Sequence, residues 1–489
     1  MLANYADLLN GGANVRLHAP LALTGICLAQ IADIVLLGLA LFAVLAPLRR
    51  TRLYPVVQLL LAILVPPFIL WRAEPLIPFD LPYGVVIAFA LVWAAVLLLM
   101  FMRRSSPWYG QTMRFASALG ASFALFALFS VLQLLWLASW KPGPQQHSAA
   151  WATTAQPPRQ HPLLVWIIFD ELSYDQAFEH RAHDLELPHF DALREQSMLF
   201  TDVQPAGYKT TKVIPSLLSG ESVQDERYTM GNGLLIHAEG IPGFHLLNGS
   251  GTVFADAQQH GWRTSAVGWY NPYCSLYDGT IDDCYWTNWD KLEGPMAQRD
   301  RFWSNTLLPL QQLARRTLGQ HKADRDLCSY DVRHRYQTHI DLEQHAMQVL
   351  RTDQADFVFL HLPIPHSPNI WSRIDDNYTQ RCDSSYLDSL ALADRELGKI
   401  MTMLQSSPRW KDTTLIVEGD HSWRVALWNE GAAWTEEDDA ASHGVFDPRP
   451  ALLIHQAGQT QAQTNATAWP LIRVHDVVDE ILRGQPVSY

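Results

Sequence analysis

Acidic side chains and a histidine follow two apolar stretches that lie far apart in the sequence. Asp170 and Glu171 come directly after the run Leu163–Phe169, and Asp420 and His421 follow a second run. Two adjacent carboxylates repel each other unless a positive charge lies close by. Carboxylates and an imidazole together are donors that suit Zn²⁺ or Mn²⁺. These residues therefore predict a divalent metal site, although structural hydrogen bonding explains most isolated Asp-His pairs.

A pair of threonines offers a nucleophile for such a site. Thr210 and Thr211 lie in the segment Gly207–Gly220. A hydroxyl beside a divalent metal loses its proton more easily and can then attack an electrophilic centre. The alternative is that the two threonines only cap a helix that begins nearby.

An alternation of strands and helices is needed to bring these side chains together. The runs Leu163–Phe169, Asp356–His361 and Thr413–Val417 are apolar and contain β-branched residues, which is typical of buried parallel strands. Helical patterns at 341–350 and 387–404 precede two of them. This alternation predicts an α/β fold with a mostly parallel central sheet. Ligands bind such sheets beyond the carboxyl ends of the strands, where the acids and histidines fall.

The charge distribution divides the chain into two parts. The 489 residues carry a net charge of −13, which argues against nucleic acid as a partner. Residues 1–150 hold nine Lys or Arg and four Asp or Glu, a net charge of +5, so the remainder is strongly acidic. We expect a transmembrane domain at 1–141, a linker at 142–160 and an extracytoplasmic catalytic domain at 161–489.

The first part contains four apolar stretches, and a membrane span needs about 20 residues. They predict a four-helix transmembrane anchor with spans at Leu21–Leu48, Tyr54–Trp71, Tyr83–Met102 and Phe115–Trp140. Arginines in the loops 49–53 and 103–114 place these loops in the cytoplasm and both the N-terminus and the large domain outside. Asp33, within the first span, either has a function or fixes the packing of the bundle.

This topology puts four cysteines in an oxidising compartment, where disulfides form. Cys274 and Cys284 are ten residues apart and suit a local loop, which leaves Cys328 and Cys382 as the second pair. Four cysteines allow three pairings, and the sequence leaves the choice open. Cys27 should stay reduced.

Several short motifs follow one another along the second part of the chain. They are Pro188–Asp202, His260–Trp269, Pro365–Pro368, Tyr386–Asp394 and Asp412–His421. Because they occur in the order found in sulfatases, the domain from 163 to about 485 resembles the sulfatase-like branch of the alkaline phosphatase superfamily. The resemblance implies an α/β domain of the sulfatase and alkaline phosphatase type.

One departure from the sulfatase pattern indicates a particular branch. Thr210, ten residues before Gly220, stands where sulfatases have the Cys or Ser of a Cys-x-Pro-x-Arg motif. A threonine on a membrane-anchored outer domain is similar to lipid A phosphoethanolamine transferases and lipoteichoic acid synthases. The resemblance implies a metal bound by Thr210, an acid at the first strand end, and the later Asp-His pair. That acid is Glu171 or Asp170, and both stay open. Zinc is the first expectation for the metal, with manganese, magnesium and calcium as alternatives.

The same resemblance implies a metal-dependent transferase. It would move phosphoethanolamine or phosphoglycerol from a phospholipid donor, through a phosphothreonine, to an envelope glycan or lipid acceptor. It would lie in the bacterial inner membrane with its catalytic domain in the periplasm. The residues expected to bind substrate or move protons are His366 and His443, together with Lys209, Lys212 and His361 for binding. The alternatives are a membrane-anchored hydrolase of sulfate or phosphate esters and an inactive binding module.

Overall fold

The computed structural model describes residues 23–73, 83–103, 107–139, 146–149, 161–229, 233–247, 249–287, 301–307, 320–429, 431, 433–487 and 489. The chain forms two compact units. One contains residues 20–140 and 299–308, and the other contains the sequence from 141 onwards without that short segment. Each unit is considered by itself.

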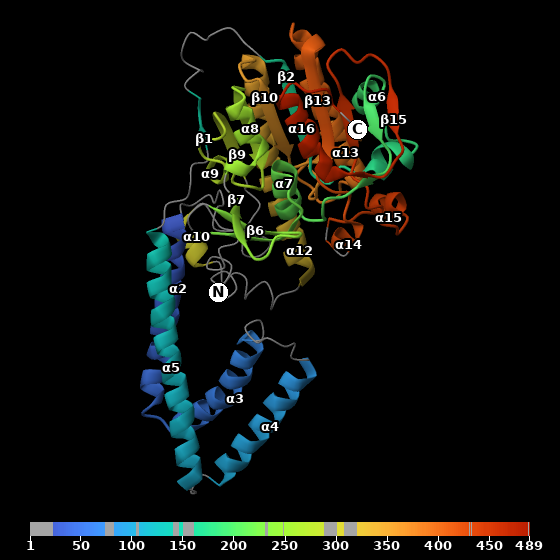
Figure 1. The fold of residues 1–489 in the computed structure, drawn as a ribbon. Coiled ribbons are helices and arrows are strands. Elements are labelled where there is room, and N and C mark those ends of the chain that lie inside the picture. The colour runs from blue at the N-terminus through green and yellow to red at the C-terminus, as the bar shows by residue number, and fades with distance from the viewer. Residues whose placement is uncertain are drawn as a thin grey trace. The chain divides into compact units, whose positions relative to one another are not determined.

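The first unit is helical, and its long helices occupy the four stretches that the sequence predicts (Figure 1). Its helices are α2 (Leu23–Leu48), α3 (Tyr54–Ala73), α4 (Tyr83–Met102), α5 (Pro107–Ala138) and α10 (Phe302–Thr306). Helix α2 packs against α5 and α10, and α3 packs against α4. Asp33 is buried within this unit.

One of these helices meets the length and apolarity required to cross a membrane. Among the described residues this is the stretch Thr24–Leu48, of 25 residues. The shorter apolar stretches are Tyr54–Leu64, Ile87–Met102 and Ala127–Ala138. A membrane helix in the first unit is thus supported by composition, whereas the four-span anchor stays a prediction.

The second unit is built on a nine-stranded sheet in the order β1-β9-β8-β10-β2-β13-β14-β3-β15. The strands are β1 (Gln146–His147), β2 (Leu163–Phe169), β3 (Met198–Phe200), β8 (Thr264–Trp269), β9 (Asp283–Thr287), β10 (Phe357–Leu362), β13 (Thr413–Gly419), β14 (Leu452–His455) and β15 (Gln463–Asn465). The five strands from β9 to β13 run parallel. Strand β1 is antiparallel to β9, and β14 is antiparallel to both β13 and β3.

The sheet is therefore mixed: five of its eight strand pairings are parallel and three are antiparallel. The mostly parallel sheet expected from the sequence describes its central strands, and the antiparallel pairings lie toward its edges. The long apolar strands that dominate the sequence pattern are the central parallel ones. The outer strands are short, and their direction depends on how the chain returns to the sheet. Strand β1 also lies inside the predicted linker 142–160, so part of that segment joins the edge of the sheet.

Helices cover both faces of the sheet (Figure 1). One face carries α6 (Pro188–Arg194), α12 (Gln320–Thr352) and α13 (Tyr386–Ser406). The other carries α7 (Thr210–Ser219), α8 (Val253–Gln259) and α16 (Val474–Leu482). Within β2, Val165 and Ile167 pack toward the first set, and Trp166 and Ile168 pack toward the second. A strand buried on both faces is apolar throughout, which explains the uninterrupted run in the sequence.

Smaller elements surround this core. A three-stranded sheet contains β5 (Val223–Tyr228), β6 (Leu234–Ala238) and β7 (His245–Leu247). Two short pairs are β4 (Val203–Gln204) with β16 (Trp469–Pro470), and β11 (Trp371–Ser372) with β12 (Asn377–Tyr378). Among the described residues, the other α-helices of this unit are α9 (Tyr273–Leu276), α14 (Val425–Trp428) and α15 (Glu436–Ser442).

Two disulfides connect elements within this unit: one joins α9 to β9, and the other joins α12 to the segment before α13. Cys274 is bonded to Cys284, and Cys328 is bonded to Cys382. This is the pairing that the ten-residue spacing favoured. Cys27 is free and buried in the first unit.

Candidate metal centre and active site

The sheet register places two carboxylates side by side. In the parallel ladder Phe169 lies opposite Gly419, so the next residues, Asp170 and Asp420, leave neighbouring strands at the same level. Gly419 is required there because a Cβ atom would lie 2.4 Å from the Leu172 carbonyl oxygen. The strand ends expected to form a site therefore do converge.

Thr210 joins this pair of carboxylates from the first turn of α7. Its Oγ1 donates a hydrogen bond to Asp170 Oδ2 at 3.1 Å and lies 3.4 Å from His421 Nε2. The hydroxyl of Thr211 instead donates to Glu226 at 2.6 Å. No side chain caps the start of α7, where Lys209 is the N-cap residue. The pair of threonines thus does not act as the helix cap, and its two members face different surroundings.

The four donor groups form a compact, buried cluster. Ligand atoms of Asp170, Asp420 and His421 all lie within 4.8 Å of one another, and none of these three residues is exposed to solvent. His421 Nε2 lies 3.3 Å from Asp420 Oδ2 and 3.9 Å from Asp170 Oδ1. Thr210 is the outermost member, at 5% exposure.

The hydrogen bonding of this cluster fits a bound cation. His421 Nδ1 lies 3.1 Å from the Ser422 carbonyl oxygen, so Nδ1 carries the proton and the Nε2 lone pair faces the carboxylates. Asp170 Oδ1 and Asp420 Oδ2 are buried and have no hydrogen-bond partner among the described residues. Burial and the neighbouring charge of Asp170 raise the pKa of Asp420. One oxygen of each carboxylate thus remains without a hydrogen bond beside an imidazole lone pair, and a divalent cation would satisfy this set of donor atoms.

Glu171 turns away from the cluster. Its backbone is left-handed, with φ of 67°, which is uncommon for a residue with a side chain. The Tyr386 hydroxyl donates to the Glu171 carbonyl at 2.6 Å, and the Glu171 amide donates to Asp420 Oδ1 at 3.1 Å. Its carboxylate accepts from Arg424 Nε at 2.5 Å and from Trp428 Nε1 at 2.9 Å. Of the two adjacent acids, Asp170 therefore lies in the cluster and Glu171 forms a buried ion pair.

Two arginines that the sequence reasoning did not select flank His366. Arg424 Nη2 lies 3.0 Å from His366 Nε2, and Arg335 Nη2 donates to the Ser367 carbonyl at 3.0 Å, close to His366 Nδ1. Removal from water and these guanidinium groups lower the pKa of His366 well below its usual range, although Asp170 opposes this. The imidazole is therefore neutral and accepts a hydrogen bond from Arg424. His366 thus helps to position the Arg424 guanidinium and carries no positive charge itself. Arg424 follows His421 by three residues, and this proximity was the one available sequence signal.

His361 lies next to the cluster and is fully buried. Its Nδ1 lies 2.8 Å from the Tyr273 hydroxyl, and its Nε2 lies 3.7 Å from Asp170 Oδ2. Gly268 makes room for this arrangement, because a Cβ atom there would lie 2.2 Å from the Tyr273 ring. His361 thus borders the cluster at Asp170, and its side chain has no contact with solvent.

The three other residues expected at the site lie at its margin or beyond it. Lys209 is exposed directly before Thr210. Lys212 donates to the Gln224 carbonyl, so its charge is directed toward β5. His443 is exposed at the end of α15, with a left-handed φ of 48°.

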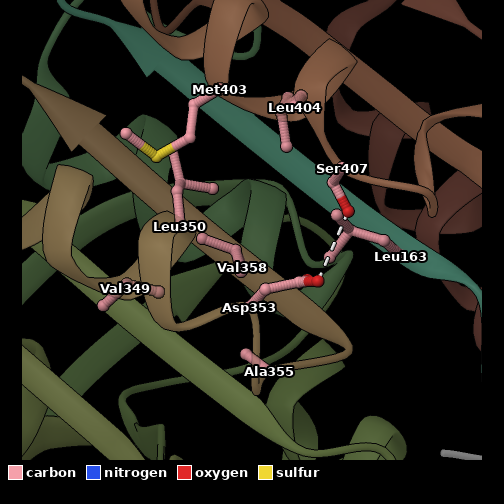
Figure 2. Close-up of a pocket in the computed structure, with 9 residues that line it drawn as sticks. All are labelled: Leu163, Val349, Leu350, Asp353, Ala355, Val358, Met403, Leu404 and Ser407. Carbon is pink, nitrogen blue, oxygen red and sulfur yellow. Dashed lines mark hydrogen bonds between the residues drawn. The ribbon is translucent and has the colours of Figure 1, made fainter.

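A small apolar pocket lies elsewhere in the domain (Figure 2). It is lined by Leu163, Val349, Leu350, Asp353, Ala355, Val358, Met403, Leu404 and Ser407. Leu163 begins β2, and Val358 lies near the start of β10. The pocket is therefore at the N-terminal ends of these parallel strands, whereas the cluster lies at their C-terminal ends. Ser407 donates to Asp353, which also pairs with Arg409, and the other lining side chains are apolar. The pocket therefore lacks the converging polar groups that would define a catalytic site.

The family of the chain follows from its sequence. The sulfatase family model matches residues 162–483, about two thirds of the chain. The chain belongs to the sulfatase family, in the sulfatase-like branch of the alkaline phosphatase superfamily. Members of this superfamily are enzymes, and they use divalent metals. A search among curated protein sequences finds no match.

Solved structures of low sequence identity resemble this domain. Ps i-CgsB is 14% identical, with a TM-score of 0.41, over 67% of this chain and 73% of that one. The phosphonate monoester hydrolase of Agrobacterium radiobacter is 13% identical, with a TM-score of 0.39, over 66% and 74%. The lipoteichoic acid synthase LtaP from Listeria monocytogenes is also 13% identical, with a TM-score of 0.39, over 66% and 72%. At these values the likenesses carry no argument about substrate.

Proposed function

We propose that this protein transfers phosphoethanolamine or phosphoglycerol from a phospholipid to a glycan or lipid acceptor of the bacterial envelope. The observation that carries the proposal is the position of the Thr210 hydroxyl. It lies within 3.4 Å of both Asp170 and His421, in the first turn of a helix. The start of a helix favours a phosphate because its free N–H groups and its dipole attract negative charge.

The reaction proceeds in two displacements. Thr210 Oγ1 forms a bond to phosphorus while the bond from phosphorus to the glycerol oxygen breaks, and diacylglycerol leaves with a proton. An acceptor hydroxyl then forms a bond to phosphorus, the bond to Thr210 breaks, and the threonine hydroxyl is restored.

Residues of the chain orient the Thr210 hydroxyl and offset negative charge during these steps. Asp170 Oδ2 holds the hydroxyl in place by accepting its hydrogen bond. A divalent cation, zinc in our proposal, held by Thr210, Asp170, Asp420 and His421, would lower the pKa of the hydroxyl and offset negative charge on the phosphate. Arg424, which also contacts His366 and the Tyr208 carbonyl, neutralises Glu171, so this second acid adds no net negative charge beside the cluster.

A location at the membrane fits a lipid donor. The apolar helix α2 supports attachment to a membrane, and two disulfides suit a domain outside the cytoplasm. We therefore include in the proposal a multi-pass protein of the inner membrane whose catalytic domain lies in the periplasm.

The decisive experiment compares the two neighbouring threonines. Thr210→Ala should lower transfer from labelled phosphatidylethanolamine or phosphatidylglycerol by at least about a thousandfold, because the nucleophile is removed. Thr211→Val is the matched control, and it should keep most of the activity because its hydroxyl contacts Glu226 instead of the cluster. Without acceptor, wild-type protein should gain a mass adduct on Thr210, and the mass identifies the head group.

The same assay separates the alternatives. An adduct on Thr211, or full activity in Thr210→Ala, would overturn the assignment of the nucleophile. Faster cleavage of a sulfate ester than of any phospholipid would make the protein a hydrolase of sulfate esters. Inertness toward all donors, with metal bound, would indicate a binding module.

A further inference from the structure

Hydrophobic side chains are exposed on three segments that adjoin the catalytic cluster. Tyr208, two residues before Thr210, is 51% exposed, and Leu427 on α14 is 56% exposed. Val445 and Phe446, in the loop after α15, are 67% and 41% exposed. Large side chains in water cost free energy, and neighbouring ones on a folded domain usually mark a binding surface.

Hydrogen bonds and a ring contact connect these segments to the site. The rings of Tyr208 and Phe446 meet edge to face, with their centroids 5.8 Å apart. Arg424 Nη1 donates to the Tyr208 carbonyl at 3.4 Å, while its Nε donates to Glu171. Leu427 adjoins Trp428, whose indole N–H also donates to Glu171. The three segments are thus held in place by the residues that border the cluster.

The loop that carries Val445 and Phe446 is held in a conformation that costs free energy. His443 and Gly444 have φ values of 48° and 66°. The left-handed region is unfavourable for a residue such as His443. The chain therefore turns sharply after α15, and the two hydrophobic residues that follow stay on the surface.

We infer that Tyr208, Leu427, Val445 and Phe446 form a lipid-binding rim for the acyl-bearing end of the donor phospholipid. This inference rests on the proposed function, because a lipid whose phosphorus meets Thr210 must extend its glycerol and acyl chains past the entrance. Exposed Lys209 lies between Tyr208 and Thr210, and aromatic and basic residues together are typical of surfaces that meet anionic lipid. An acceptor glycan or water would gain nothing from aliphatic residues such as Val445.

The first test measures contact with lipid and does not depend on activity. The full-length protein, with Cys27→Ala, carries a bimane fluorophore on Val445→Cys and is reconstituted in vesicles that contain a doxyl-labelled phospholipid. The control fluorophore is on Lys411→Cys, whose side chain is 80% exposed two residues before β13, at the end of that strand opposite Asp420. We expect quenching at 445 to exceed quenching at 411 at least twofold. Equal quenching at the two positions would overturn the inference.

The second test measures how the rim affects the choice of donor. We compare long-chain phosphatidylethanolamine with glycerophosphoethanolamine, which has the same head group and no acyl chains. The measured quantity is kcat/KM for the long-chain donor divided by kcat/KM for the acyl-free donor. Phe446→Ser and Leu427→Gln should each lower this ratio at least tenfold. The control is Ile241→Ser, at a hydrophobic residue that is 40% exposed in the turn between β6 and β7, and it should leave the ratio unchanged.

The outcomes distinguish the rim from the reaction. An unchanged ratio in both rim variants would overturn the rim. Protection of the fluorophore at 445 that depends on protein concentration, without lipid quenching, would also overturn it and indicate a second copy of the chain. Selective quenching at 445 in a protein that is inactive on both donors would support the rim and refute the proposed reaction.

Discussion

The ion pair between Glu171 and Arg424 allows a quantitative test of the electrostatics of the site. Arg424 Nε donates to a carboxylate that is fully buried. Removing one member of a buried ion pair costs about 3–5 kcal/mol, because the other charge is left uncompensated. In Arg424→Met, Trp428 Nε1 still donates to both carboxylate oxygens. We therefore expect the lower end, a loss of about 3 kcal/mol in the free energy of unfolding.

A double-mutant cycle isolates the interaction between the two charges. Glu171→Gln keeps an oxygen for Trp428 but loses the charge-assisted bond, which costs about 1.5–3 kcal/mol. The double variant leaves no buried charge at this position, so the two losses should not add, and we expect a coupling energy of about 2 kcal/mol. Burial raises the pKa of Glu171, so the coupling should weaken as the pH falls and the carboxyl is protonated.

The assay is denaturant unfolding of the full-length protein in detergent at pH 7.5, with the metal content of each variant measured alongside. Because Glu171 faces Arg424 and Asp170 lies in the cluster, Glu171→Gln should keep the metal-to-protein ratio of the wild type. Asp170→Asn should lose most of the metal. A coupling energy below about 0.5 kcal/mol, or loss of metal in Glu171→Gln, would refute this assignment of the two acids.

Two further predictions concern stability. Burial lowers the pKa of His455, which stacks on Trp410, so the unfolded chain binds the proton more tightly. Stability should therefore rise as the pH increases toward the unfolded pKa of about 6.5, and His455→Phe should flatten this rise in thermal unfolding curves; an unchanged curve would count against it. Separately, Cys274→Ser with Cys284→Ser should lower the free energy of unfolding by about 2–3 kcal/mol, and peptide mapping that finds free thiols at these positions would contradict the disulfide.

The central strands were predictable because burial on both faces leaves a direct trace in the sequence. Leu163–Phe169 is apolar at every position and forms β2 with the expected bounds. The short strands β3, β14 and β15 have no such pattern, because three or four residues are too few to show a period. Strand β14 is antiparallel to β13 and β3, whereas β15 is parallel to β3. These directions depend on the path of the chain after β13, which local sequence does not specify.

The parts of the candidate site that lie at strand ends were predictable from the sequence. The direction in which individual side chains point was not. Asp170 and Asp420 had to converge once β2 and β13 were parallel neighbours. Sequence adjacency gave no means of separating Asp170 from Glu171, since a single left-handed residue decides where the second carboxylate points. The role of Arg335 could not be predicted for a different reason. It lies in the middle of the long polar helix α12, and only tertiary packing determines which face of that helix meets the site.

The different surroundings of the two adjacent acids have a consequence for the charge of the site. If Asp170 and Glu171 both faced the cluster, it would hold three carboxylates together with Asp420. Such a site would be strongly negative and would repel a phosphodiester. Arg424 neutralises Glu171 and also donates to the Tyr208 carbonyl. The cluster is then left with two carboxylates, whose charge a divalent cation would balance. An anionic phosphodiester, as the proposed reaction requires, would then approach without the repulsion that a third carboxylate would add.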